Sequence, residues 1–401
     1  MSLSHRKVKK ELILKDAQGN ALANKQVKIE QTSHSFLFGC GAFEFLRIFR
    51  EGKTDEVMDI TSKWLELFNY GTLPFYWGRY EPEEGKPDQE TLMKTAMYLQ
   101  DRGVRVKGHP LCWHTVCADW LMKYDNATIL KKQLERIRRE VTNFKGVIDM
   151  WDVINEVVIM PVFDKYDNAV TRICNDRGRI ALVKDVFAAA HESNPEATLL
   201  INDFNLSESY RILIDGLLNA GVPIGAIGIQ THQHQGYMGK EKVLDILKRY
   251  EVFGLPIHFT ENTLISGEIM PSYIVDLNDW QVDEWPTTPE GEERQCREIE
   301  EMYRTLFDHP LVEAITTWDF RDGAWLKAPA GFLRLDNSLK PSYKMLKKLI
   351  KEEWSTNLDV RTDGEGRISV EGFKGDYCIS VDGAKAKVSM NDDSTETIKL
   401  M

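Results

Sequence analysis

The sequence lacks several features that would place it in a common functional class. It has no surplus of positive charge, because 51 Lys and Arg stand against 62 Asp and Glu and the formal net charge is -11. Nucleic acid is held mainly by basic surfaces, so we do not expect it as a partner. No apolar run approaches the roughly 18 residues that a membrane-spanning helix needs, and we expect no membrane segment.

Cysteine pairs and a secretory leader are also missing. The six cysteines contain no Cys-x-x-Cys motif, which excludes a zinc ribbon and a thioredoxin-like site and predicts free, buried thiols. The first 20 residues are basic but have neither the apolar stretch nor the small-residue cleavage site of a signal peptide. These two absences favour the cytoplasm.

What the sequence does contain, from residue 36 onward, is an alternation of short apolar runs and amphipathic segments of helical period, the pattern of parallel βα units. No G-x-G-x-x-G motif follows the first run, so the main sequence argument for a dinucleotide-binding sheet is missing. Eight units favour a closed (β/α)8 TIM barrel over an open sheet. The strands are predicted at 36–40, 67–71, 104–108, 148–154, 198–203, 226–231, 256–260 and 313–318, and helices at 88–101, 128–143, 179–193, 207–220, 240–253, 292–307 and 340–353.

Both ends of the chain have a different residue pattern from the middle. Residues 11–31 and 358–389 carry β-rich runs separated by Gly-containing turns. Neither piece buries a core alone, and together they resemble the two halves of a transthyretin-like or carboxypeptidase-regulatory-like sandwich. We therefore expect a barrel at 35–354 and one small accessory β module built from 1–34 and 355–401.

Acidic side chains follow two of the expected strands. In a parallel barrel the active site lies at the C-terminal ends of the strands. Glu156 follows the fourth strand and Glu261 the seventh, and the apolar character of both strands argues against solvated loop glutamates. Hydrolysis of a glycosidic bond needs one carboxyl to protonate the leaving oxygen and a second to attack or to activate water. The pair therefore predicts a glycoside hydrolase.

Tryptophan is concentrated at the same strand ends. A single tryptophan there is as often a core residue as a binding residue, but flat rings also stack on the C–H faces of sugars. Seven of the ten tryptophans fall at this end, which favours a polysaccharide cleft. They are Trp77, Trp113, Trp120, Trp280, Trp285, Trp318 and Trp325.

A resemblance to a known family rests on six ordered blocks: VKGHPLCWHT, WDVINE, INDFN, IGIQTHQH, HFTEN and ITTWDFRDGAWL. They resemble glycoside hydrolase family 10, the retaining endo-β-1,4-xylanases, and WDVINE is the most specific of them. The resemblance implies double displacement, with Glu156 as acid/base and Glu261 as nucleophile, on xylan or decorated xylo-oligosaccharides of plant origin. It also implies export. We expect a monomer without a metal or cofactor.

The resemblance implies roles for further side chains as well. Asn155 would contact the sugar 2-hydroxyl, and His232 would hydrogen-bond the nucleophile. Asn202 and Gln230 would support the strand ends. The other implied substrate-binding residues are His109, Trp113, His114, His234, Trp318, Trp325 and Tyr76.

The segment TLPFYWGRYEP departs from the family pattern. A Glu-Asn pair and a Lys that bind the glycone are usual there, whereas this chain has Thr72, Leu73 and Tyr76. Val116 and Thr263 likewise replace a Gln and an Asp. We therefore expect weak binding of unsubstituted xylan on the glycone side. Tyr76 then either faces a substituted sugar or packs beneath its loop.

Two alternatives remain open. His109, His114, His232 and His234 could ligate a metal in a barrel hydrolase, although such barrels carry His-x-His after the first strand, where this chain has Phe-Gly-Cys. A non-catalytic sugar-binding barrel could keep the aromatic rim, but the two glutamates argue against it. Turnover of an aryl β-xyloside with and without chelator separates the three hypotheses.

Overall fold

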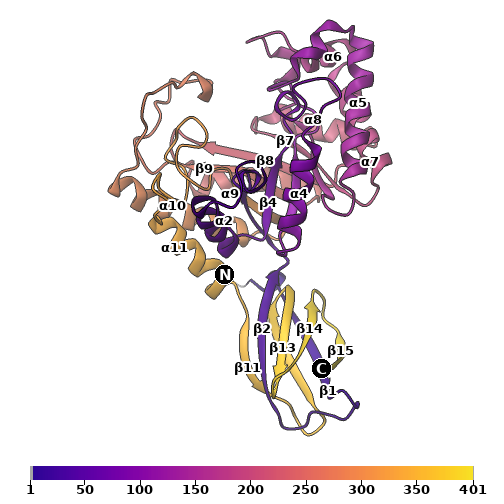
Figure 1. Cartoon of the computed structure of the whole chain (residues 1–401), viewed down its shortest axis with the longest axis vertical. Helices are drawn as coiled ribbons and strands as arrows, with labels where there is room; N and C mark the ends of the chain where they lie inside the picture. Colours follow the sequence, from indigo (N-terminus) through magenta and orange to yellow (C-terminus); the bar gives the residue numbers. More distant parts are fainter. Residues whose placement is uncertain (1–2, 401) are drawn as a thin grey trace. The chain divides into compact units, whose positions relative to one another are not determined.

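The computed structural model describes residues 3–400 (Figure 1). The chain divides into two compact units, one formed by Gly39–Tyr343 and the other by the segments that precede and follow it. Within residues 3–400 no helix combines the length and apolarity that crossing a membrane requires. All six cysteines are free, and three of them are buried: Cys40, Cys112 and Cys174.

A closed barrel of eight parallel strands forms the centre of the larger unit, and the strands follow one another around it in chain order. The prediction of a (β/α)8 TIM barrel is confirmed. The strands consist mainly of buried residues because both faces are covered, by the barrel interior and by the outer helices. They are β3 (Leu37–Gly41), β4 (Tyr70–Pro74), β5 (Arg105–His109), β6 (Met150–Asn155), β7 (Thr198–Asp203), β8 (Ala226–Gln233), β9 (Ile257–Leu264) and β10 (Val312–Thr317).

Helices occupy the connections between these strands, and several begin at polar capping residues. Thr54, Asp125 and Thr288 each accept a hydrogen bond from a backbone N–H of the first helical turn. The helices are α1 (Phe45–Arg50), α2 (Asp55–Leu67), α3 (Trp77–Tyr80), α4 (Gln89–Gln100), α5 (Asn126–Asn143), α6 (Ala169–Arg177), α7 (Arg179–Ser193), α8 (Glu208–Asn219), α9 (Lys240–Tyr250), α10 (Pro289–Phe307) and α11 (Pro341–Lys348), which a further helical turn, Leu349–Glu353, extends.

The second strand lies further along the chain than predicted. Leu67 is the last residue of α2, where it joins Val57, Ile60 and Trp64 on the buried face, and the strand begins only at Tyr70. An apolar residue at the end of an amphipathic helix has the same local pattern as the start of a strand, so periodicity alone does not separate them.

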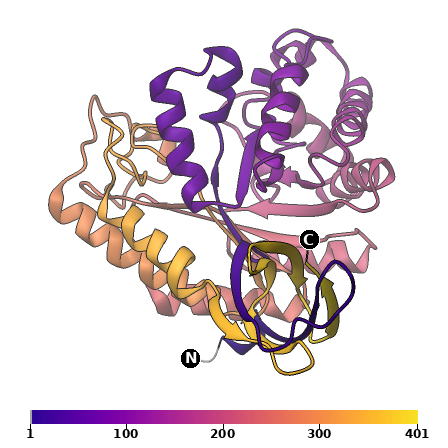
Figure 2. The ribbon, with the colours of Figure 1, turned by 60° about the horizontal axis from the view of Figure 1, so that its bottom comes forward.

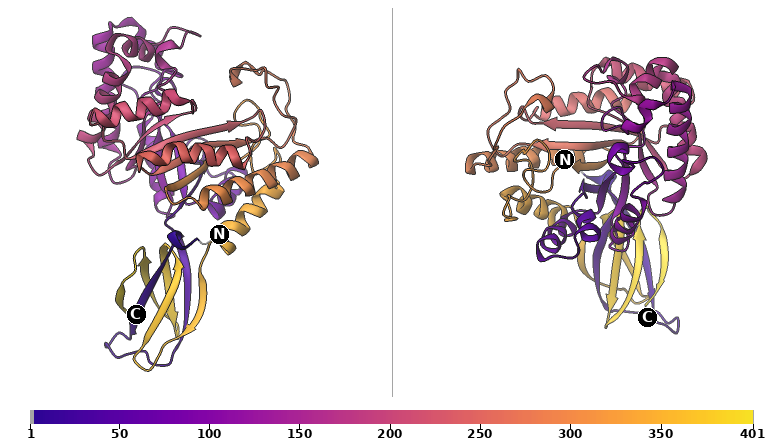
Figure 3. Two further views of the ribbon diagram at one scale, coloured as in Figure 1. Left: turned by 180° about the vertical axis from the view of Figure 1, so that it is seen from behind. Right: turned by 45° about the horizontal axis from the view of Figure 1, so that its top comes forward.

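The two ends of the chain build two small sheets together. β1 (Lys7–Lys15) pairs with β12 (Arg367–Phe373) and β15 (Thr395–Lys399). In the other sheet, β2 (Gln26–His34) lies between β11 (Asn357–Arg361) and β13 (Gly375–Val381), and β14 (Ala384–Met390) follows β13. Figures 2 and 3 show these indigo and yellow strands side by side. Apolar residues of both ends, including Leu12, Ile29 and Ile379, form one core, so the accessory β module of the predicted fold is confirmed.

Candidate active site

Glu156 lies directly after β6 in a left-handed backbone conformation, with φ 55°. Its N–H donates to the carbonyl of Asn202 at 2.8 Å, and its Oε2 accepts from Trp113 Nε1 at 2.8 Å. A non-glycine residue held at positive φ is uncommon and marks a place where the surroundings fix the backbone. Burial, reinforced by the negative charge of Glu261, raises the pKa of Glu156 to about 8.

Glu261 lies within β9 and has two close hydrogen-bond partners. Asn202 Nδ2 donates to its Oε1 at 2.7 Å, and His232 Nε2 lies 3.0 Å from its Oε2. Burial by itself would raise the pKa of Glu261. The charge of His109 and the hydrogen bond from His232 outweigh that effect and hold the pKa below its ordinary value. The two carboxyls are therefore driven toward opposite protonation states.

A buried charged group supports Glu261 from within the barrel. Lys107 on β5 lies 2.6 Å from Asp152 on β6, and the same carboxylate oxygen is 2.7 Å from His109 Nδ1. The charges of both Lys107 and His109 lower the pKa of Glu261. Lys107 and Asp152 were not predicted as site residues from the sequence, although a charged residue inside an apolar strand is a signal that could have found them.

Amide side chains fix the geometry between the two glutamates. Asn202 donates to Asn155 Oδ1 at 2.8 Å as well as to Glu261, and its own Oδ1 accepts from Thr260 at 2.6 Å. Gln230 donates to Asn155 Oδ1 at 3.0 Å. The structure thus brings Asn155, Asn202 and Gln230 together with both carboxyls, and their satisfied hydrogen bonds hold the network in one arrangement.

Aromatic rings surround this polar centre. The Tyr76 ring lies 5.7 Å from His109 and 5.6 Å from Trp113, centroid to centroid. Trp318 lies 5.3 Å from His109 and 6.0 Å from His232. The negative charges of Glu261 and Glu156 contribute, after burial, to a raised pKa of Tyr76. Tyr76 therefore lies beside His109 and Trp113, near enough to the two carboxyls for their charges to affect it.

Comparison with known proteins identifies the family of the barrel. The model of glycosyl hydrolase family 10 matches residues 75–348. The chain belongs to this family. The match starts just after Thr72 and Leu73, two of the positions that depart from the family pattern.

The curated relatives of the chain share modest sequence identity with it. The chain is 24% identical over 314 residues to an endo-1,4-beta-xylanase/feruloyl esterase of Xylanibacter ruminicola, which covers 68% of this chain and 40% of that protein. It is 26% identical over 261 residues to an endo-1,4-beta-xylanase of Geobacillus stearothermophilus, covering 61% of this chain and 75% of the other. It spans less than half the length of the first three curated relatives that it matches.

Solved structures show the same fold. Xylanase 10B of Thermotoga petrophila, solved in complex with xylobiose, superposes with a TM-score of 0.65 at 20% identity. The alignment covers 80% of this chain and 95% of that one. The larger unit therefore has the same barrel fold as that structure.

Two of the histidines predicted to bind substrate, His114 and His234, are buried in the structure. His114 is fully buried against Phe163, with ring centroids 4.5 Å apart, and burial lowers its pKa to about 4. His234 packs on Trp325 at 5.0 Å, and burial lowers its pKa to about 3. Within residues 3–400, no three His, Cys, Asp or Glu side chains form a group that could hold a metal ion.

The tryptophans divide between the site and the loops around it. Trp325 packs on His232 at 4.6 Å and so joins Trp113 and Trp318 beside the carboxyls. Trp77 instead packs against Trp120, and its Nε1 donates to Glu81. Trp280 and Trp285 pack into a loop core as well, so the structure places three of the seven tryptophans beside the carboxyls.

A cavity of about 340 Å³ lies next to this site, on the side of β3, β4 and β10. Tyr76, Trp318 and Trp325 line it, and so does Arg79. Leu73 and Thr72 are fully buried, so neither presents a polar group to a bound sugar. The cavity wall therefore offers rings and a guanidinium where the family pattern has a Glu-Asn pair and a Lys.

Proposed function

We propose that the protein hydrolyses β-1,4-xylosidic bonds with retention of anomeric configuration, acting on xylan or decorated xylo-oligosaccharides. The observation that carries the proposal is the opposed protonation of two carboxyls in one site. Glu156, with its pKa raised to about 8, keeps its proton at neutral pH, while Glu261, with a lowered pKa, stays ionised. Such a pair supplies one acid and one nucleophile to the same bond.

In the first step Glu261 attacks the anomeric carbon, and Glu156 gives its proton to the leaving oxygen. His232 and Asn202 hold the two oxygens of Glu261, which fixes the direction of attack. In the second step Glu156, now ionised, takes a proton from water, and that water displaces Glu261 from the sugar. The Trp113 hydrogen bond stabilises the ionised form of Glu156 that this step requires.

The membership of glycosyl hydrolase family 10 and the endo-1,4-beta-xylanases among its relatives support xylan-type substrates. The deciding experiment is an NMR time course of xylo-oligosaccharide cleavage. The β-anomer should be the first product, because two displacements restore the starting configuration. A first product in the α-configuration would contradict the proposal. Chelator should leave the rate unchanged, and Glu261→Gln serves as the inactive control.

A further inference from the structure

Two long segments leave the barrel from the strands that carry the two carboxyls. We name residues 156–168, between β6 and α6, the β6 arm. Residues 265–288, between β9 and α10, are the β9 arm, which projects from the barrel in Figures 1 and 3. Most βα loops contain two to six residues, so both arms are long. Long loops in compact domains commonly serve binding or gating.

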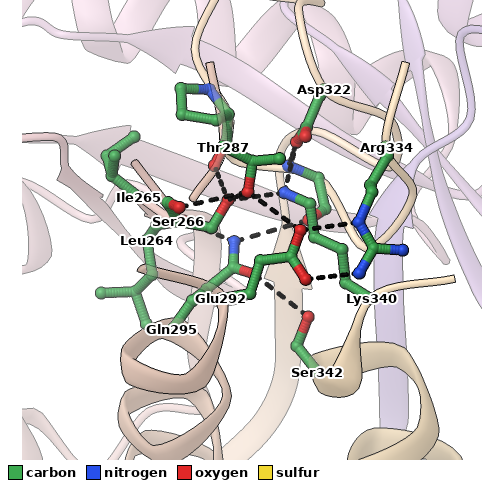
Figure 4. Close-up of polar contacts among 12 residues, drawn as sticks. Leu264, Ile265, Ser266, Thr287, Glu292, Gln295, Asp322, Arg334, Lys340 and Ser342 are labelled. Atoms are coloured by element: carbon green, nitrogen blue, oxygen red, sulfur yellow. Dashed lines mark hydrogen bonds and ion pairs between the residues drawn. The ribbon is translucent and has the colours of Figure 1, made fainter. Parts of the chain in front are cut away.

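The base of the β9 arm is pinned by a buried polar cluster (Figure 4). Ser266 Oγ lies 2.7 Å from Thr287 Oγ1, which joins the two ends of the arm. Lys340 Nζ donates to Ser266 Oγ at 2.7 Å and pairs with Asp322 at 2.6 Å. Asp322 belongs to the loop that also carries Trp318 and Trp325, so the arm and this loop share one rigid base.

The body of the β9 arm has a small apolar core of its own. Trp285 and Met270 are buried in it, and Trp280 packs on Trp285 at 5.8 Å. Gln235, in the loop after β8, donates to the carbonyls of Pro271 and Ile274 at 3.0 and 2.7 Å. These contacts hold the arm over the end of β8.

The β6 arm is held on its own side of the barrel mouth. The N–H of Val158 donates to Asp203 Oδ2 at 2.9 Å, which ties the start of the arm to the end of β7. Phe163 packs on His114, and Tyr166 packs on Phe163 at 4.9 Å. The arm is thus fixed by contacts on both sides of Lys165.

The tips of the two arms meet through charged side chains. Lys165 Nζ lies 2.6 Å from Asp276 Oδ2 and 2.8 Å from Asp279 Oδ1. In the barrel, β7 and β8 lie between β6 and β9. The chain therefore runs from Glu156 through the β6 arm, across the ion pairs, and back through the β9 arm to Glu261. This path closes a ring over the β7–β8 side of the mouth.

We propose that this ion-paired clasp makes the site selective for short xylo-oligosaccharides and chain ends over the interior of a polymer. The inference rests on the proposed function. A polymer that crosses both carboxyls has to leave the site on the β7–β8 side and must be threaded through the ring. A short chain enters from the β3–β4 side, where the cavity of about 340 Å³ lies, and ends beneath the clasp. Lys165, Asp276 and Asp279 are thus specificity-determining residues outside the catalytic centre.

The test compares kcat/KM on soluble polymeric xylan with kcat/KM on an aryl β-xylobioside. Lys165→Glu replaces two attractions by two repulsions and opens the clasp. The triple variant Lys165→Glu, Asp276→Lys, Asp279→Lys restores the pairing with the charges exchanged. Lys131→Glu, at an exposed position of α5 outside both arms, makes the same change of net charge and is the matched control.

In Lys165→Glu the ratio of polymer to short-substrate kcat/KM should rise by up to about fivefold, the upper limit of what one exposed ion pair is worth. The triple variant should return the ratio to the wild-type value, and Lys131→Glu should not move it. Molar salt screens exposed charges, so it should raise the same kcat/KM ratio in the wild type, as Lys165→Glu does. An unchanged ratio in Lys165→Glu with normal short-substrate turnover would overturn the clasp.

A separate readout keeps the two proposals apart. If the wild type turns over neither substrate, the proposed function fails, and the clasp is then decided by calorimetric binding of xylotriose and polymeric xylan to Glu261→Gln. A gain in polymer binding when Lys165→Glu is added supports the clasp. Equal polymer binding with and without that substitution contradicts it.

Discussion

Lys107 Nζ lies 2.6 Å from Asp152 Oδ2, and neither side chain is exposed to solvent. Burying two charges is costly, and only their attraction and further hydrogen bonds offset that cost. The same Asp152 oxygen also contacts His109 Nδ1, so one carboxylate holds both the Lys107 ammonium and the His109 ring next to Glu261. Since His109 and Lys107 both lower the pKa of Glu261, this buried cluster also influences the protonation of that carboxyl.

Removing this lysine should therefore affect stability and chemistry together. Lys107→Met leaves Asp152 buried with one partner fewer and should lower the free energy of unfolding by about 3–5 kcal/mol. The pKa of Glu261 should rise, which moves the acidic limb of the kcat/KM profile to higher pH. Urea denaturation and pH profiles on an aryl xyloside measure the two effects. Lys107→Met with Asp152→Asn should recover stability without restoring the acidic limb, and a full restoration would contradict the electrostatic role.

The two glutamates should respond differently to substitution. Glu261→Gln should abolish turnover of every substrate, because no nucleophile remains. Glu156→Ala should spare the first step for a dinitrophenyl glycoside, whose leaving group needs no proton, while cleavage of a natural oligosaccharide is lost. Azide should accelerate the dinitrophenyl reaction of Glu156→Ala by taking the place of the activated water. Equal losses of activity on both substrates in Glu156→Ala would contradict the assignment of Glu156 as acid/base.

The raised pKa of Glu156 sets the basic limb of activity. With that pKa at about 8, kcat/KM should fall as the pH rises through 8, because the acid loses its proton. Trp113 donates a hydrogen bond that lowers this pKa, so Trp113→Phe should move the limb upward by about one unit. Phe320, buried against Phe68 and Phe332 and without a hydrogen bond to either glutamate, offers Phe320→Leu as a control that should leave the limb in place.

The same shift predicts a pH dependence of stability. A carboxyl whose pKa is higher in the folded state than in the unfolded state contributes stability below its unfolded value near 4.5. That contribution is lost as the pH rises through the folded value. Glu156→Gln should therefore become more stable relative to the wild type between pH 5 and pH 9. Parallel unfolding curves for the two proteins across this range, with a constant difference, would contradict the raised pKa.

Much of the fold followed from local pattern. The alternation of apolar runs and amphipathic segments repeats eight times. A strand that is buried on both faces is recognisable because its apolar residues are nearly continuous. The end of a helix and the start of a strand can have the same apolar pattern. This is the case at Leu67, where the predicted strand began too early. Short or irregular helices, such as α1 and α6, have too few turns for a periodic signal and were not predicted.

The candidate site could be predicted only where chemistry and position coincide. Glu156 follows the apolar strand β6 and Glu261 follows the apolar residues that begin β9, so their place at the barrel mouth could be predicted from the sequence. Trp77 and Trp113 both follow a barrel strand, so the sequence does not distinguish them. Only the structure shows that Trp77 packs on Trp120, whereas Trp113 donates to Glu156. The pairing of Lys165 with Asp276 joins distant parts of the chain and depends on how far two arms reach, which no local pattern encodes.

The glycone side gives the last prediction, since the polar groups usual in the family are absent there. Each missing charge-assisted hydrogen bond is worth about 1.5–3 kcal/mol, so an unsubstituted linear chain should be held weakly. Arg79 lines the cavity with its guanidinium 5.9 Å from the Tyr76 ring. In the part of the chain that the structure describes, no carboxylate pairs with it, whereas Arg50 in the same cavity pairs with Asp88 at 2.6 Å. An acidic substituent on the sugar would give Arg79 a partner.

The measurement is kcat/KM on linear xylo-oligosaccharides and on glucuronosyl-substituted ones of equal backbone length. The substituted chain should be preferred by about tenfold, which corresponds to about 1.4 kcal/mol in transition-state binding. Arg79→Ala should remove the preference, and Arg50→Ala should keep it, because Arg50 is already paired. Methyl esterification of the uronic acid should remove the preference, as Arg79→Ala does. A tenfold preference for the linear chain would show that other residues replace the lost contacts, because a wall of rings with one unpaired cation cannot by itself favour an uncharged, unbranched sugar.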